Sequence, residues 1–262
     1  MLAAQFHALN SVKGLSDRAD APSFKRNLPI ILLPSRLILF AVFQLFGAAI
    51  IWVVEGHFSY QQAGIFWPYT ATGANVVTFA LLHWAFKMEG LSVIDLYRFN
   101  KPTIRIDILT AVGVFIVAVP ISFFPNGLLA TLLFGNPGAV GPYMFGTMSP
   151  ILAYLTVLLP LTIAFAEMPL YMGYILPRLG LRLRSCATAV LIVGFFLALQ
   201  HCTLPLIIDL RFIIWRLGMF LPLAILFAVI LNWRPRLIPY IMIGHALLDF
   251  AAVAMIVLAS VH

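Results

Sequence analysis

Residues 163–180 read IAFAEMPLYMGYILPRLG, an apolar run that carries a single carboxylate, Glu167. An ionisable side chain at the centre of a bilayer costs about 2.5–3.5 kcal/mol even on lenient insertion scales. Such residues face one another or a wet cavity, and they mark functional sites. If this stretch lies in a membrane, other helices must supply polar partners for Glu167.

The composition of the whole chain is that of a membrane protein. Of its 262 residues, 63% are hydrophobic and 10% are charged, and the mean hydropathy is +1.03. These values lie outside the range of soluble globular domains, and no polar segment is long enough to form one. We therefore expect an all-α polytopic membrane protein with a polar tail over residues 1–27 and a single transmembrane helical domain over residues 28–262.

The net charge of +7 does not indicate nucleic-acid binding, because the basic residues are dispersed over short loops and are not interleaved with aromatics. The two cysteines, Cys186 and Cys202, lie in apolar surroundings without metal-type spacing. They predict neither a disulfide nor a zinc knuckle. The partner indicated by composition is the lipid bilayer.

Several apolar runs are long enough to cross a hydrocarbon core about 30 Å thick. The predicted bundle of about seven transmembrane helices has spans near 37–54, 66–86, 108–124, 150–177, 186–204, 212–232 and 237–259. Lysine and arginine gather before the first span and after the second, fourth and sixth, which predicts a cytoplasmic N-terminus and an external C-terminus. Residues 125–149, rich in Gly and Pro and free of charge, are expected to form a partly re-entrant external loop.

Four ionisable residues inside the predicted spans are expected to converge on a polar site within the bundle. Glu167 and His201 flank a turn near 180–185 at similar separations, so an antiparallel hairpin would bring them to similar depth. His245 and Asp249 are spaced i, i+4 and share one face of the last span. The alternative is that these residues have structural roles only. Glu167 would then form an ion pair with Arg216, and His201 would be a packing residue.

Three stretches at these positions resemble the ordered motifs of the CPBP intramembrane proteases. That family unites the type II CAAX prenyl endopeptidases with bacterial bacteriocin-processing and immunity proteins, and its motifs read Glu-Glu-x-x-Phe-Arg-Gly, Phe-x-x-x-His and His-x-x-x-Asn/Asp. This chain has EMPLYMG at 167–173, LALQH at 197–201 and HALLD at 245–249. The resemblance covers a motif-bearing core of about residues 150–255.

The first motif departs from the family pattern at two positions, where Met168 replaces the second glutamate and Met172 replaces the arginine. Leu197 stands where the second motif has its aromatic residue, with Phe196 one place before it. Replacing both members of a buried ion pair by apolar residues is often neutral or stabilising. We therefore hypothesise that a supporting Glu–Arg pair was lost as a unit while Glu167 was kept.

Peptide hydrolysis needs a base that activates water and donors where the tetrahedral oxyanion forms. Glu167 with His201 can supply the base, while His245 can donate to the oxyanion with Asp249 either fixing its tautomer or donating as well. The family resemblance implies the same roles for these four catalytic residues. The expected enzyme is an intramembrane endopeptidase that cleaves a membrane-associated peptide or protein without a cofactor.

Three alternatives stay open. Glu167, His201, His245 and Asp249 could instead hold zinc or manganese, although the chain has no His-Glu-x-x-His sequence. A non-catalytic, immunity-type relative could bind a peptide or partner protein in the same cavity. A proton-coupled transporter could use the two acids as a relay, which the lack of internal repeats disfavours. Twelve arginines against four lysines, small size and short loops point to a bacterial cytoplasmic membrane.

Overall fold

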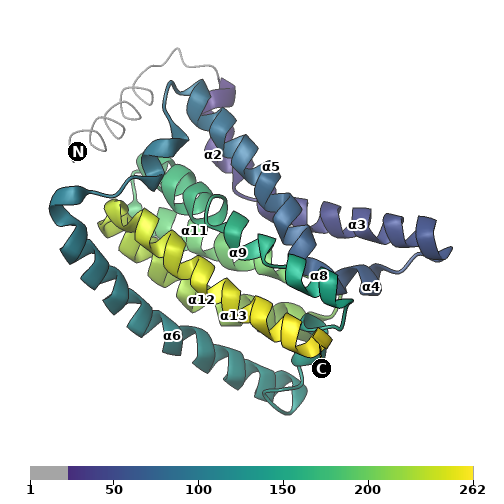
Figure 1. Cartoon of the computed structure of the whole chain (residues 1–262). Coiled ribbons are helices and arrows are strands. Elements are labelled where there is room, and N and C mark those ends of the chain that lie inside the picture. The colour runs from purple at the N-terminus through teal and green to yellow at the C-terminus, as the bar shows by residue number, and fades with distance from the viewer. Residues whose placement is uncertain (1–22, 262) are drawn as a thin grey trace.

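The computed structural model describes residues 23–261, and the named elements within that range are all helices (Figure 1). The all-α prediction is therefore confirmed for this part of the chain. Most of the predicted tail over residues 1–27 lies outside the described residues. The last part of that tail belongs to the first described helix, α2, which spans Ser23–Leu32.

The first predicted span corresponds to α3, Ser35–Glu55, which ends at the left-handed Gly56 with φ of 76°. A left-handed residue after the last turn is a common helix stop, and glycine adopts it without strain. The short helix α4, Tyr60–Ile65, then leads into α5, Trp67–Met88. In Figure 1, α2, α3 and α5 form the upper part of the molecule.

The third predicted span is longer than the sequence indicated. Helix α6 covers Ile104–Phe134 and runs through Pro120 and Pro125, so the predicted loop boundary at residue 125 is wrong. Membrane helices tolerate proline where neighbouring groups compensate the lost hydrogen bond. The added turns are tied to α12 because Trp215 Nε1 donates to Asn126 Oδ1 at 2.9 Å.

The predicted span 150–177 is a broken helix. Pro169 has no N–H to donate to the carbonyl of Phe165, and that carbonyl accepts a hydrogen bond from the Tyr97 hydroxyl at 3.0 Å instead. A π-helical segment begins at Pro169, next to Glu167. The elements of this region are α8, Pro150–Leu155; α9, Leu158–Ile163; η3, Pro169–Ile175; and α10, Leu176–Leu183.

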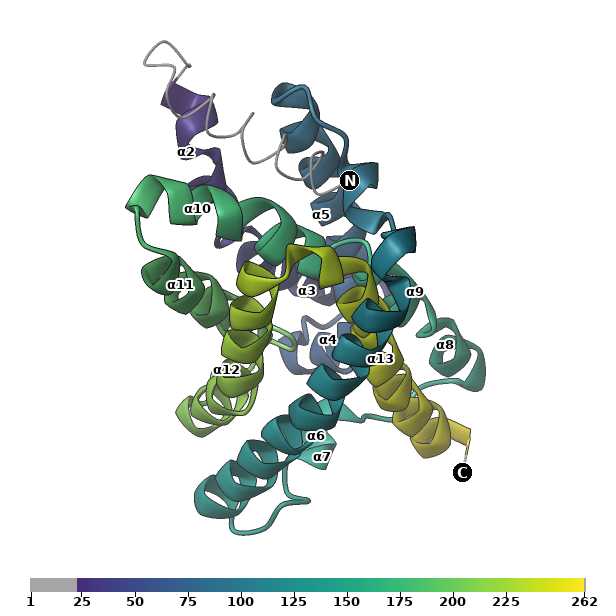
Figure 2. The same ribbon diagram turned by 90° about the vertical axis from the view of Figure 1, so that its left-hand side faces the viewer.

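The C-terminal half packs as a group of helices, with α12 lying against both α11 and α6 (Figures 1 and 2). Its elements are α11, Cys186–Leu199; η4, Gln200–Cys202; α12, Leu210–Trp233; η5, Pro235–Leu237; and α13, Ile238–Val261. The remaining short elements are η1, Val93–Tyr97; η2, Lys101–Thr103; and α7, Gly141–Met144.

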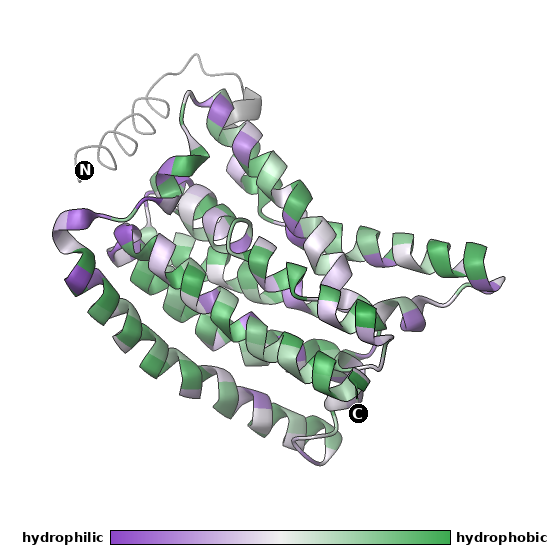
Figure 3. Ribbon diagram, viewed as in Figure 1, coloured by the Kyte–Doolittle hydropathy of each residue, from purple (hydrophilic) through white to green (hydrophobic). Residues whose placement is uncertain are grey.

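Among residues 23–261, four helical runs are long and apolar enough to cross a membrane, namely Ser35–Glu55, Val93–Phe134, Leu210–Trp233 and Pro235–Val261. The runs Pro150–Ile163 and Cys186–Cys202 are apolar but shorter, and α5 is not among the four, so the seven-span count is not confirmed. Figure 3 shows hydrophobic colouring along most of α6 and α13. Exposed apolar side chains such as Leu109 and Phe123 on α6 suit contact with lipid.

A buried ion pair joins the end of α5 to the helix that follows the Glu167 region. Arg178 Nε lies 3.0 Å from both carboxylate oxygens of Glu89, and the Tyr174 hydroxyl donates to the same carboxylate at 2.8 Å. The two charged side chains are only 7% and 9% exposed. Removing one partner of a buried pair leaves the other charge uncompensated.

Replacing Arg178 by Met should lower the free energy of unfolding by about 3–5 kcal/mol, because Glu89 would stay buried without its partner. The double change Glu89→Met/Arg178→Met should recover most of that loss. Denaturant unfolding in detergent measures both values. Asp95→Ala, which breaks an exposed pair with Arg98, is the control and should cost no more than about 1 kcal/mol. Effects of Glu89→Met and Arg178→Met that simply add would contradict the coupling.

Candidate functional site

Glu167 lies deep inside the bundle, with 2% of the residue exposed. Only one of its two carboxylate oxygens is tied by hydrogen bonds. Oε2 accepts a 2.7 Å bond from Gln200 Nε2 and a longer 3.4 Å bond from Arg36 Nη2. Oε1 accepts neither of these bonds. Oε2 therefore anchors the side chain, whereas Oε1 is available to accept a proton.

Arg36, in the first turn of α3, is completely buried and supplies the positive charge beside Glu167. Its Nε donates to Gln200 Oε1 at 2.6 Å, and its Nη1 donates to Asn75 Oδ1 at 2.8 Å and to Thr78 Oγ1 at 3.4 Å. Sequence reasoning counted Arg36 only as a flanking base at the membrane surface. Asn75, the single amide side chain of the predicted span 66–86, and Thr78 three positions later were the available signal for a buried polar partner.

The first motif itself fixes where α3 begins. The Tyr171 hydroxyl, in η3, donates to the carbonyl of Leu33 at 3.3 Å, three residues before Arg36. Asn75 also donates to Thr162 Oγ1 at 3.0 Å, which connects α5 to α9. Tyr171, at the aromatic position of the motif, therefore does more than pack. Its bond to Leu33 holds the start of α3, and with it Arg36, beside Glu167.

His245 lies between two carboxylates. Its Nε2 is 3.5 Å from Glu167 Oε1 and 3.6 Å from Asp249 Oδ2. Both acids therefore approach the same ring nitrogen, and Nδ1 has no hydrogen-bond partner within residues 23–261. The expectation that Asp249 either fixes the tautomer of His245 or donates as well stays a prediction. A ring nitrogen that faces two carboxylates favours the protonated form, so the Nε2–H of His245 is a hydrogen-bond donor.

His201 has the opposite arrangement. Its Nδ1 lies 2.9 Å from the carbonyl oxygen of Leu197, which can only accept, so the proton belongs on Nδ1. In the neutral ring Nε2 is then an acceptor. The ring stacks on Phe220 with centroids 3.7 Å apart, which fixes its plane. The two histidines therefore differ in kind, one an acceptor and one a donor.

Arg216 does not pair with Glu167 as the structural alternative proposed. Its Nε donates to the carbonyl of His201 at 3.1 Å, and its Nη2 donates to the carbonyl of Leu204 at 2.6 Å. These carbonyls belong to the turn after α11, where helical acceptors lose their intrahelical partners. Arg216 thus holds the turn that carries His201.

Glu167, His201 and His245 line one small cavity whose other walls are apolar and include Phe227. Its volume is about 30 Å³. A cavity needs at least roughly 10–15 Å³ and polar partners to hold a water, so this one can hold a water molecule among the three polar side chains. Asp249 is not among the residues that line this cavity, but it approaches the Nε2 of His245 at 3.6 Å.

Of the two methionines of the first motif, Met168 lines this cavity, and both are buried. Met168 is 2% exposed and Met172 is 3% exposed, both within the main hydrophobic core. The cation of the site comes from Arg36 on another helix. The paired loss of a glutamate and an arginine stays a prediction. Gly173 allows close packing here, because a Cβ added to it would lie 2.7 Å from Leu96 Cδ1.

No three His, Cys, Asp or Glu side chains are grouped as metal ligands within the described part of the chain. The absence of a metal from the site nevertheless remains a prediction. Comparison with protein-family models, curated proteins and solved structures gives no match. The resemblance to the CPBP proteases therefore rests on the three motifs alone.

Arg36→Met should lower the free energy of unfolding by about 3–5 kcal/mol, because Glu167 would stay buried without a countercharge. Adding Glu167→Gln should restore most of the loss, since a neutral amide needs no countercharge. Thermal and denaturant unfolding in detergent provide the measurement. The exposed Arg105 offers the matched control, and Arg105→Met should change stability by less than about 0.5 kcal/mol. Equal stability of the single and double variants would show that the two residues are not coupled.

Proposed function

We propose that this protein is an intramembrane endopeptidase that uses Glu167 and His201 to activate water. The observation that carries the proposal is the shared cavity, where one untied carboxylate oxygen, one acceptor imidazole and one donor imidazole surround room for a water molecule. Hydrolysis needs this combination of acceptors for the water and a donor for the oxyanion. The three motifs that bring these residues together resemble those of the CPBP proteases.

In the proposed reaction, water attacks the carbonyl carbon of the scissile peptide bond. The new C–O bond forms as a proton passes from water to Glu167 Oε1 or His201 Nε2. The Nε2–H of His245 donates to the oxyanion, a role in which each preorganised donor is worth about 10²–10³ in rate. When the C–N bond breaks, the proton goes to the leaving amine. Arg36 and Gln200 hold Oε2 throughout, so the base stays in place.

One observation favours a non-catalytic, partner-binding role instead. Glu167 already has a charged partner and an amide donor, and its 3.5 Å separation from His245 is longer than a good hydrogen bond. This geometry is that of a satisfied structural network. Catalytic contacts are often long without substrate, however, so the distance does not exclude catalysis.

The proposed setting is a bacterial cytoplasmic membrane, crossed by a bundle of about seven helices with the N-terminus inside. The support is the alternation of basic loops along the sequence and the four apolar runs that are long enough to span. In this orientation the loops near residues 100 and 235 face the cytoplasm.

Single cysteines at Lys101 and Asn232, in a chain with Cys186 and Cys202 replaced by Ala, should resist an impermeant thiol reagent added to intact cells. Phe58→Cys, in the exposed loop between α3 and α4, should react and serves as the control. All three should react after the membrane is permeabilised. Rapid labelling of Lys101→Cys in intact cells would overturn the orientation.

Glu167→Gln should abolish proteolysis, with a loss of at least about 100-fold in rate, because general bases contribute about 10²–10⁴-fold. The measurement compares peptide termini by mass spectrometry in membranes that contain the wild-type protein or the variant. Asp209→Asn, at the start of α12 and away from the cavity, is the matched control and should leave the termini unchanged. Addition of a strong chelator should also have no effect.

Identical termini in the wild-type and Glu167→Gln membranes would favour the partner-binding alternative. Loss of the termini on chelation, restored by zinc, would instead favour the metal-dependent alternative. The two outcomes are distinguishable, because the first depends on replacing the Glu167 carboxylate and the second depends on removing and restoring a metal ion.

A further inference from the structure

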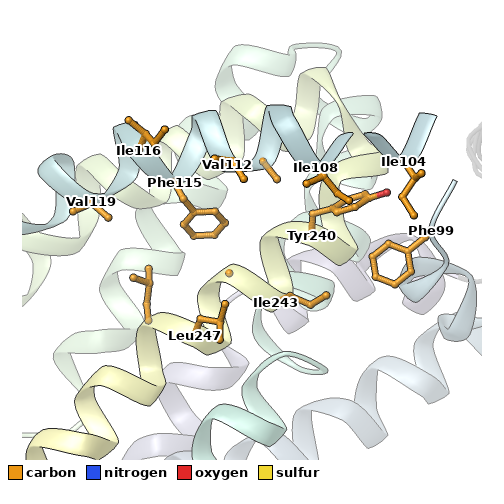
Figure 4. Close-up of a pocket in the computed structure, with 13 residues that line it drawn as sticks. Phe99, Ile104, Ile108, Val112, Phe115, Ile116, Val119, Tyr240, Ile243 and Leu247 are labelled. Atoms are coloured by element: carbon orange, nitrogen blue, oxygen red, sulfur yellow. The ribbon is translucent and has the colours of Figure 1, made fainter. Parts of the chain in front are cut away.

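A long apolar groove runs between α6 and α13 (Figure 4), and it shares no lining residue with the polar cavity. Its volume is about 720 Å³, well inside the range of roughly 300–1,000 Å³ typical of ligand sites. Val112 and Ile116 line it from α6, while Ile243 and Leu247 line it from α13. Figure 2 shows the two helices diverging toward their far ends.

The shape and chemistry of the groove fit a hydrocarbon chain. The lining residues on α6 extend from Ile104 to Val119, a rise of about 22 Å at 1.5 Å per residue. One leaflet of a bilayer contributes about half of a 30 Å hydrocarbon core, so the groove can hold an acyl chain over the depth of a leaflet. A peptide is disfavoured, because its N–H and C=O groups would find no partners along these apolar walls.

The groove has a polar group at one end only. Tyr240 is 8% exposed, and its buried hydroxyl has no hydrogen-bond partner within residues 23–261. Figure 4 shows this hydroxyl at the end of the groove near Ile104 and Phe99. A buried hydroxyl left unpaired is costly, so a ligand that forms a hydrogen bond with it gains affinity.

Positive charge gathers at the same end. Lys101 and Arg105 are exposed on either side of Ile104, whereas the acid nearby, Asp107, is already paired with Arg236 at 2.8 Å. Basic residues near a membrane surface attract anionic lipid headgroups. The end with the unpaired hydroxyl therefore suits an anionic headgroup.

We propose that the groove binds one acyl chain of an anionic membrane phospholipid, with the phosphate beside Tyr240, Lys101 and Arg105. The apolar length of the groove fits the acyl chain. The unpartnered hydroxyl and the basic residues at one end fit the anionic headgroup. The inference does not depend on the proposed proteolysis, because none of the groove residues belongs to the polar cavity.

The bound chain would cover the outer wall of the candidate site. Phe115 packs on the backbone of Gly244, where an added Cβ would lie 2.1 Å from the ring. The Phe115 ring is 6.0 Å from that of Phe227, which lines the polar cavity and is 6.5 Å from the ring of His245. An acyl chain against Phe115 thus seals the lipid side of the helix that carries His245.

The test uses the full-length protein, reconstituted in vesicles of equal parts phosphatidylglycerol and phosphatidylcholine and then extracted in mild detergent. Native mass spectrometry reports the retained lipid. The wild-type chain should retain a single phosphatidylglycerol in preference to phosphatidylcholine. Val112→Trp/Ile243→Trp, which fills the groove from both walls, should lower retention at least about tenfold, or ~1.4 kcal/mol. Tyr240→Phe should reduce the preference for phosphatidylglycerol.

The control variant is Val42→Trp, an apolar position of similar exposure on α3 outside the groove, which should retain lipid like the wild type. Val112 and Ile243 are each 51% exposed, so tryptophan there leaves the core unchanged, and circular dichroism checks the fold. Equal retention of the two lipids by the wild-type chain would overturn the proposal. So would undiminished retention in the double variant, or a peptide retained in place of a phospholipid.

Discussion

The contact between Arg36 and Glu167 constrains the arrangement of the bundle. Neither side chain is more than 3% exposed, and a buried charge without a partner is far more costly than a buried pair. The pair forms only if α3 begins beside the Glu167 helix and if Gln200, at the end of α11, reaches both groups. Any other packing that moved one of these elements would leave a buried charge without its partner. The ion pair therefore favours one arrangement of the helices even if its net stabilisation is small.

The same contact gives the site its asymmetry. Arg36 and Gln200 occupy Oε2 of Glu167, which leaves Oε1 toward His245. His201 presents an acceptor because its other nitrogen is bonded to a backbone carbonyl, and Arg216 holds the turn that places it. These polar contacts orient Glu167, His201 and His245, and this orientation supports the proposed water-activating role of the cavity.

The sequence predicted those parts of the structure that depend on local pattern. Apolar runs identified helices, and similar separations across a turn predicted that Glu167 and His201 lie at similar depth, where both line one cavity. Arg36 was missed because charge counting treats any base at a span end as interfacial, whereas this one is completely buried and bonded to Gln200 and Asn75. The extension of α6 through Pro125 was missed because the bond from Trp215 Nε1 to Asn126 Oδ1, which ties these turns to α12, is long-range in the sequence.

The central claim is that Glu167 activates a water molecule that ends in the product. Membranes containing the protein, incubated in water enriched in ¹⁸O, test this most directly by mass spectrometry of new C-terminal carboxylates. The account predicts that these carboxylates carry ¹⁸O in the wild type and are not formed when Glu167 is replaced by Gln. New C-termini that form equally without the Glu167 carboxylate, or that carry no ¹⁸O, would contradict it.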